Sequence, residues 1–229
     1  MVAYRMNWDR LGAATGIVFV VLFVVALIIG GQPVDEDVVD FFLTNRQPLL
    51  TQAYLYGLSI VFLIWFLGSV RSHLRLSEGG TGRLSAVSFA GGIIFVTVLL
   101  VSGIVNTALA DGIARFSDSE TTRALYALVV LANDVNWFPL AVFTGAASLV
   151  AFRHDAFPRW LAWLGAALAL AAPVGALAIV VDNGPFTSGG IFNDIVAPFL
   201  FLLWVVLLSI VLIQEAGRTD KPSALDMGT

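Results

Sequence analysis

Long uncharged stretches alternate with short charged clusters along the whole chain. Six stretches are free of charge, apart from Asp134 inside the fourth. A membrane-spanning helix needs about 20 mainly apolar residues, and each stretch is long enough. Strands of a membrane barrel would alternate in polarity over about ten residues, which these runs do not do. The pattern predicts an all-α, six-helix transmembrane bundle with spans at about 11–31, 49–70, 85–109, 125–151, 160–181 and 195–214.

The segments between the spans are too short to fold as separate units. We therefore expect a single integral membrane domain over residues 1–229, with residues 215–229 as a disordered cytoplasmic tail. The first apolar stretch follows Arg5 and Arg10, as in a signal peptide. It exceeds the 7–15 apolar residues or so of such a peptide, so we interpret it as a retained span.

Lysine and arginine lie mainly on one side of the predicted membrane. Six spans place both termini on the same side, and that side holds nine of the twelve basic residues. Only Arg46, Arg115 and Arg123 fall on the other side, which also holds nine of the sixteen acidic residues. The positive-inside rule then predicts that both termini are cytoplasmic.

The first outer loop combines acidic and apolar residues. Asp35, Glu36 and Asp37 precede a short apolar segment that contains Phe41 and Phe42. Acidic side chains favour a helix start, and the apolar residues suit a membrane surface, so we expect a short interfacial helix. The acidic residues lack the spacing of an EF-hand, and we expect no metal site there.

Composition agrees with a membrane protein and excludes several other classes. The chain is 59% hydrophobic and 12% charged, with a mean hydropathy of +0.90. Soluble domains carry about 25% charged residues. The net charge of −4 offers no basic surface for nucleic acid, and the absence of cysteine excludes disulfides and thiolate metal sites.

The most unusual segment is the fourth span, where polar side chains surround the intramembrane charge. A carboxylate at the bilayer centre costs about 2.5–3.5 kcal/mol on the insertion scale and is a candidate functional group. Helical geometry places Asn133 and Trp137 near Asp134, with Asn136 on the other flank of Asn133. Several polar residues end the neighbouring spans on the outer side, and together they predict an outward-facing cavity of negative charge. The candidate ligand or ion site comprises Asn106, Asn133, Asp134, Asn136, Trp137 and Asp182; Gln52, Tyr54, Tyr56, Asn183, Asn193 and Asp194 lie at the same level.

Two interpretations of this cluster stay open. In the first, it binds a proton, a cation or a small polar ligand from the outer side. In the second, it only holds helices together, with Arg115 or Arg123 reaching down to Asp134.

The histidines suggest no cofactor. His73 and His154 are expected in cytoplasmic loops beside arginines, and no span is expected to contain a histidine, which leaves no pair of axial ligands for haem. The sequence also contains no phosphate-binding glycine loop and no recognisable catalytic set. We expect no catalytic, metal-binding or cofactor-binding residues.

The order of these features resembles a known group of proteins. The stretches that carry the likeness are Asp35–Val39, Asn45-Arg46, Trp65–Arg71, Gly79-Gly80, Arg83–Gly92 and Phe157–Gly165. Over residues 10–213 the chain resembles uncharacterised multi-span membrane proteins of actinobacteria, of the domain-of-unknown-function type. The resemblance implies six helices and a bacterial plasma membrane, and it implies no activity.

The sequence favours a non-enzymatic multi-pass protein, either an accessory component or a protein that binds a small ligand between its helices. A small transporter or channel-like protein that uses Asp134 is the first alternative, and a lipid-modifying membrane enzyme is the second. The expected partners are the lipid bilayer and a small polar or cationic ligand; the sequence identifies no protein partner.

Overall fold

The computed structural model describes residues 2–33, 37–181 and 184–218, and this part of the chain contains helices and no strands. Seven long helices account for most of it. Short helical segments connect them, among them two π-helical turns, η1 and η3, and one 3₁₀ turn, η2. In chain order the elements are α1 (Val2–Gly30), α2 (Val38–Thr44), α3 (Arg46–Glu78), α4 (Arg83–Ala108), η1 (Leu109–Ile113), α5 (Ala114–Phe116), α6 (Ser119–Val135), α7 (Trp137–His154), α8 (Arg159–Gly175), η2 (Ala176–Ile179), η3 (Phe192–Val196) and α9 (Ala197–Arg218).

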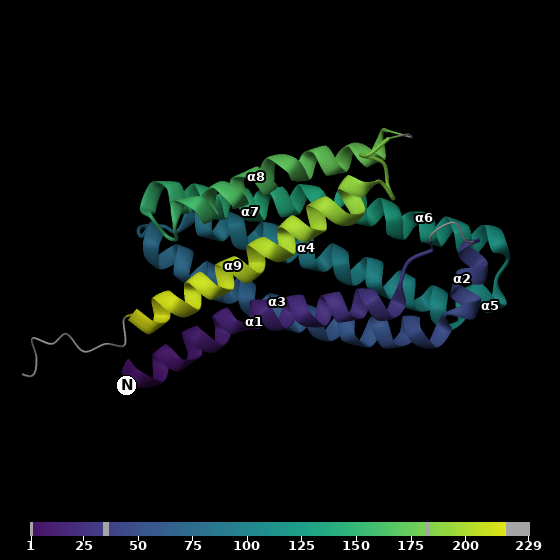
Figure 1. Ribbon diagram of the computed structural model, residues 1–229, viewed down its shortest axis with the longest axis horizontal. Coiled ribbons are helices and arrows are strands. Elements are labelled where there is room, and N and C mark those ends of the chain that lie inside the picture. Colours follow the sequence, from purple (N-terminus) through teal and green to yellow (C-terminus); the bar gives the residue numbers. More distant parts are fainter. Residues whose placement is uncertain (1, 34–36, 182–183, 219–229) are drawn as a thin grey trace, which may run out of the picture.

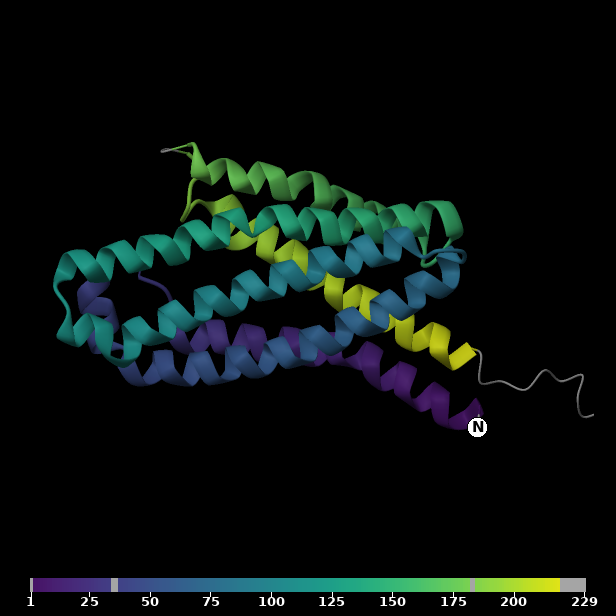
Figure 2. The same ribbon diagram turned by 180° about the vertical axis from the view of Figure 1, so that it is seen from behind.

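The long helices form a closed ring in chain order. Helix α1 packs against α3, α3 against α4, α4 against α6 and α7, α7 against α8, α8 against α9, and α9 returns to α1. The start of α1 and the end of α9 lie together at one end of the bundle, and α2 and α5 lie at the other (Figure 1). Figure 2 shows the same arrangement from behind. We call these the terminal end and the α2 end.

Within the described residues, six segments are long and apolar enough to cross a membrane, which confirms the predicted number of spans. They indicate a multi-pass membrane protein. Several helices extend beyond the predicted spans because charged residues end an apolar run without ending a helix. The third helix, for example, has 33 residues, against about 20 needed for a crossing. The segments are Arg10–Gly30, Arg46–Glu78, Arg83–Phe116, Ser119–His154, Arg159–Ile179 and Phe192–Gly217.

The fourth segment, which the sequence predicts as one span bent by Pro139, is interrupted at Asn136. Helix α6 ends at Val135, Asn136 forms a turn, and α7 begins at Trp137. Pro139 has no N–H to bond the carbonyl group of Val135, which accounts for a break one turn before the proline. Pro173 does not end α8, which continues to Gly175. The chain then changes from the α-helix to the 3₁₀ turn η2.

Two apolar clusters hold the bundle. The main core joins the six long segments and includes the fully buried Phe143, Leu140 and Trp204. A smaller cluster at the α2 end joins α2, the start of α3 and η1 through residues such as Phe41, Leu49 and Leu109. A short helix lies at Val38–Thr44, in the segment where an interfacial helix was predicted, and its apolar side packs against protein; its position at a membrane surface stays a prediction.

Small residues permit close helix contacts within the bundle. A β-carbon on Gly91 of α4 would lie 2.7 Å from the backbone nitrogen of Phe143 and 3.0 Å from the carbonyl oxygen of Pro139. A β-carbon on Gly165 of α8 would lie 2.5 Å from Ser148 Oγ. Close backbone approach of this kind replaces the hydrophobic effect as a source of stability in lipid.

Replacing Gly91 with alanine should destabilise the protein by about 1–3 kcal/mol, because backbone atoms cannot rotate away from the added methyl group. The matched control is Gly57→Ala in α3, where an added β-carbon meets nothing within 4 Å. That change should be neutral or stabilise the helix by about 0.5–1 kcal/mol. Thermal unfolding of both variants in the same detergent measures the difference, and equal stabilities would refute the packing argument.

The structure corrects two expectations at the terminal end. His73 and His154 do not lie in loops: His73 is within α3 and His154 ends α7. The His73 ring contacts the carbonyl oxygen of Ala156 and lies 3.3 Å from the carboxylate of Glu215. The predicted tail also begins later, because α9 continues to Arg218; residues 219–229 lie outside the described part of the chain.

Candidate functional site

A cavity of about 570 Å³ lies between the two apolar clusters. Phe41 and Leu49 of the α2-end cluster line one side, and Phe95, Leu140 and Phe201 of the main core line the other. Five of the six apolar segments contribute to the wall, and the fifth does not. The α1–α2 and α8–η3 connections border the cavity. Its volume falls within the range of about 300–1,000 Å³ that is typical of small-molecule sites.

Five of the six predicted site residues line this cavity: Asn106, Asn133, Asp134, Asn136 and Trp137. The sixth, Asp182, lies outside the described residues, as does Asn183. Among the other polar residues considered, Gln52, Tyr56, Asn193 and Asp194 also line the cavity. Tyr54 does not, and its side chain is 73% exposed on the outside of the bundle.

Asp134 is the buried acid of the site, with 6% of its surface exposed. Its Oδ2 accepts a hydrogen bond of 2.5 Å from the hydroxyl group of Ser188, in the connection between η2 and η3. Asp194 is exposed and lines the same cavity, which therefore carries two carboxylates. Among the described residues, no lysine, arginine or histidine lines it.

The proposed arginine partner of Asp134 is not found in the described residues. Arg123 instead bonds Asp37, and the guanidinium group of Arg115 lies 5.9 Å from the ring centre of Phe116. Arg123 does border an open hollow of about 400 Å³ beside the cavity, and Asp134 and Ser188 line both spaces. Asp134 thus lies in the partition between the cavity and this lateral hollow.

Two irregular backbone segments supply buried amides to the cavity. Asn136 occupies the turn between α6 and α7, and its Nδ2 donates to the carbonyl oxygen of Phe95 at 3.1 Å. Asn193 lies in the π-helical turn η3, and its Nδ2 donates to the carbonyl oxygen of Gly175 at 3.1 Å. Irregular turns of this type inside helices occur frequently at functional sites.

Aromatic rings form much of the apolar wall. The ring centres of Phe95 and Phe201 are 5.2 Å apart, and those of Phe23 and Tyr56 are 5.5 Å apart. Both pairs line the cavity, together with Phe19, Tyr126 and Trp137. Faces of such rings attract cations, and the attraction grows when the cation is desolvated.

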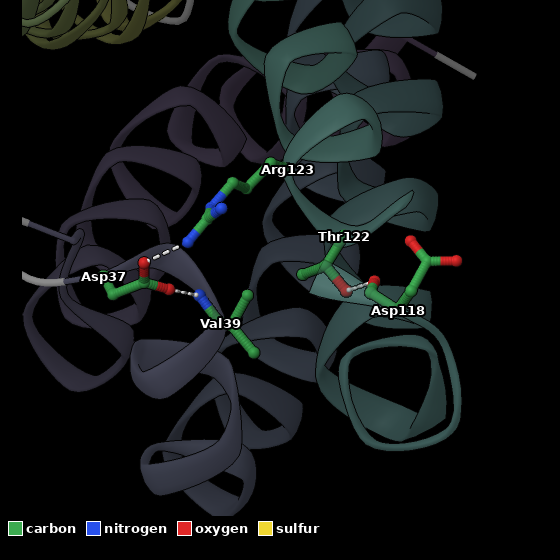
Figure 3. A network of polar contacts seen from close by, with 5 residues as sticks. All are labelled: Asp37, Val39, Asp118, Thr122 and Arg123. Carbon is green, nitrogen blue, oxygen red and sulfur yellow. Dashed lines mark hydrogen bonds and ion pairs between the residues drawn. The ribbon is translucent and has the colours of Figure 1, made fainter. Parts of the chain in front are cut away.

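Ion pairs and helix caps fix the α2 end beyond the cavity. Arg123 of α6 pairs with Asp37, whose other carboxylate oxygen accepts from the N–H of Val39 at 2.9 Å and caps α2 (Figure 3). Asp118 caps α6 by accepting from the N–H of Thr121 at 2.7 Å. On the neighbouring helix Arg46 pairs with Asp111 at 2.7 Å. These contacts tie α2 and η1 to the spanning helices.

Acidification should loosen the contact between α2 and α6. The Arg123 guanidinium holds the pKa of Asp37 below the ordinary carboxyl value of about 3.9, so the pair is intact at neutral pH and is lost as pH falls through the folded-state pKa. Asp37→Asn keeps a capping oxygen and removes the charge. We expect lower protection factors for amide exchange over Val38–Thr44 in this variant at pH 7, with little further change in these factors at pH 3. Unchanged exchange relative to Asp40→Asn, an exposed carboxylate on the same helix, would contradict the prediction.

Sequence reasoning missed Ser102, Tyr126 and Ser188 as members of the site. Ser102 carries a weak signal, as a hydroxyl group within an apolar span at the depth of Asn106. Ser188 carries none, because its contact depends on how the α8–η3 connection folds back over α6.

No family model, curated protein or solved structure matches this chain.

Proposed function

We propose that this multi-pass membrane protein binds a small organic cation in the cavity between its helices. One observation carries the proposal: the described lining contains Asp134 and Asp194 and no basic side chain. A carboxylate shielded from water is costly unless a counter-charge accompanies it, so a cation that enters the cavity offsets that cost. The aromatic wall suits the apolar body of the same ligand.

The proposal includes the orientation and the membrane. Both termini lie in the cytoplasm of a bacterium and the cavity opens toward the outside, as the distribution of basic residues favours. The chain has no cysteine, so an introduced cysteine is the single site at which a thiol reagent can label it. Ser119→Cys at the α2 end should react with an impermeant maleimide in intact cells, and Ser223→Cys only after permeabilisation. The reverse pattern would overturn the orientation.

A charge series tests the binding. We expect the purified protein to bind 2-phenylethylammonium at least about tenfold more tightly than neutral 2-phenylethanol, and to bind 3-phenylpropionate least. Asp194→Asn should weaken binding of the cation a few-fold, since the carboxylate is exposed and partly screened, whereas the control Asp40→Asn should not. Equal affinity for the cation and the neutral alcohol would refute the proposal.

A transporter is the second candidate. The break at Asn136 and the π-helical turn η3 both adjoin the cavity, and discontinuous helices at a central binding site are typical of transporters. Uptake of radiolabelled 2-phenylethylammonium into vesicles that contain the protein distinguishes transport from binding alone.

A further inference from the structure

The two carboxylates of the cavity wall come from different elements and are bridged by two consecutive residues. Asp134 lies on α6 and Asp194 in the turn η3, and both line the cavity. The hydroxyl group of Ser188 donates to Oδ2 of Asp134 at 2.5 Å. The backbone N–H of the next residue, Gly189, hydrogen-bonds the carboxylate of Asp194. One short stretch of the α8–η3 connection therefore holds the two acids beside each other.

This bridge limits the distance between the acids. The hydroxyl oxygen of a serine lies no more than about 5 Å from the nitrogen of the following residue, and each hydrogen bond adds about 3 Å or less. The carboxylate oxygens that the bridge joins are therefore at most about 11 Å apart. At such a distance, and in a partly sheltered cavity, the charges of Asp134 and Asp194 repel each other.

Neither acid has a positively charged partner. Within the described residues, no ion pair joins Asp134 or Asp194 to a basic side chain, and no basic side chain lines the cavity. Asp134 is only 6% exposed, and its hydrogen bond to Ser188 uses Oδ2, which leaves Oδ1 for another donor. A ligand that brings positive charge to both acids offsets the cost of burying one and the repulsion between the two.

The surroundings favour an organic ligand over a metal ion. Calcium takes about six to eight oxygen ligands, whereas no group of three or more acidic or histidine side chains converges in the described part of the chain. Aromatic rings also line the cavity, among them Trp137, three residues after Asp134. Such rings accept methylene groups and ammonium ions alike.

We propose that the preferred ligand is a diamine in its doubly protonated form, with a short alkyl spacer, which pairs one ammonium group with Asp134 and the other with Asp194. The inference rests on the proposed cation-binding function and adds a second charge to the ligand. An extended 1,5-diaminopentane separates its nitrogen atoms by about 7.5 Å, which the distance allowed by the bridge accommodates. Its methylene groups lie against the aromatic wall. A monoamine leaves one of the two acids without a counter-charge.

Three five-carbon compounds of equal length isolate the second charge. At pH 7, 1,5-diaminopentane carries two ammonium groups, 5-amino-1-pentanol carries one and 1,5-pentanediol carries none. We expect the diamine to bind about five- to tenfold more tightly than the amino alcohol, the contribution of one further ion pair with a partly exposed acid. Its two equivalent ends alone would give a factor of about two, since either end can occupy either position. Calorimetry on the purified full chain in detergent measures the three affinities.

Two variants locate the ammonium groups. Asp194→Asn keeps an oxygen for the N–H of Gly189 and removes the charge, so the ratio of diamine to amino-alcohol affinity should fall to about two. Asp134→Asn keeps an acceptor for Ser188 and should lower the ratio in the same way, at weaker overall binding. The control Asp40→Asn removes an exposed carboxylate of α2 that does not line the cavity, and it should leave the ratio unchanged. Thermal unfolding shows that each variant is folded.

The outcomes separate this inference from the proposed function. If the diamine and the amino alcohol bind within a factor of about two, and both bind more tightly than the diol, the diamine inference is overturned and the cation site stands. A diamine preference that persists in Asp194→Asn overturns the inference as well, because the second ammonium group then pairs elsewhere. If neither amine binds more tightly than the diol, both proposals fail.

Discussion

Asp134→Asn should lower the affinity for 2-phenylethylammonium by about 30- to 150-fold while the protein remains folded. The substitution keeps the shape of the side chain and an oxygen that accepts from Ser188, and it removes the buried negative charge. Hydrogen bonds to charged groups in sheltered sites contribute about 2–3 kcal/mol, which corresponds to this change in affinity. Calorimetry with Asp40→Asn as the control measures it.

Asp134→Leu distinguishes a ligand site from a structural cluster. If Asp134 held the helices together, its removal would strongly destabilise the bundle. Its hydrogen-bond partner, however, is Ser188, whose side chain is exposed and can bond water instead. We therefore expect a loss of no more than about 1 kcal/mol in the free energy of unfolding, together with loss of cation binding. A large loss of stability with Asp134→Leu would favour the structural interpretation.

Trp204→Ala should cause the largest loss of stability, about 3–5 kcal/mol. Trp204 of α9 is fully buried, its ring centre lies 5.4 Å from that of Phe143, and its Nε1 donates to the carbonyl oxygen of Leu161 at 3.3 Å. Truncation leaves a cavity where α7, α8 and α9 meet, and lipid cannot fill it. Unfolding in a denaturing detergent series measures the loss.

Trp65→Ala is the matched control, since this side chain is 57% exposed on the outside of α3. Its removal exchanges a contact with lipid or detergent for another such contact and should cost far less than the change at Trp204. Similar losses for the two variants would show that the core at Trp204 repacks around the missing ring.

The number of spans follows from the sequence because the bilayer imposes one requirement on every crossing. Backbone groups in hydrocarbon must bond within the segment, so each apolar run of sufficient length becomes a helix. The same energetics place Asp134 inside the bundle. Four of the predicted site residues, Asn133, Asp134, Asn136 and Trp137, line the cavity because they are close to the acid along one segment, and Asn106 lines it from α4.

The remaining features depend on contacts between distant segments. Tyr54 and Tyr56 are the same residue type two positions apart in α3, yet only Tyr56 lines the cavity. Side chains two residues apart on a helix point about 200° away from each other. The choice of Asp37 as the partner of Arg123 depends on where the α1–α2 connection lies over α6. Helical periodicity predicts that the two tyrosines face different ways but not which of them faces the cavity, and local sequence carries no information on the partner of Arg123.

The return of α9 to α1 has a consequence for biogenesis. Phe19 of α1 and Phe201 of α9 face the same cavity, with ring centres 6.3 Å apart, although almost the whole chain separates them. During synthesis α1 enters the bilayer first and α9 only after the other five segments. One side of α1 therefore remains covered by lipid until α9 arrives, and the cavity has no complete wall before that moment. A nascent chain arrested before Ala197 contains both Asp134 and the break at Asn136, but it has no enclosed place for a ligand.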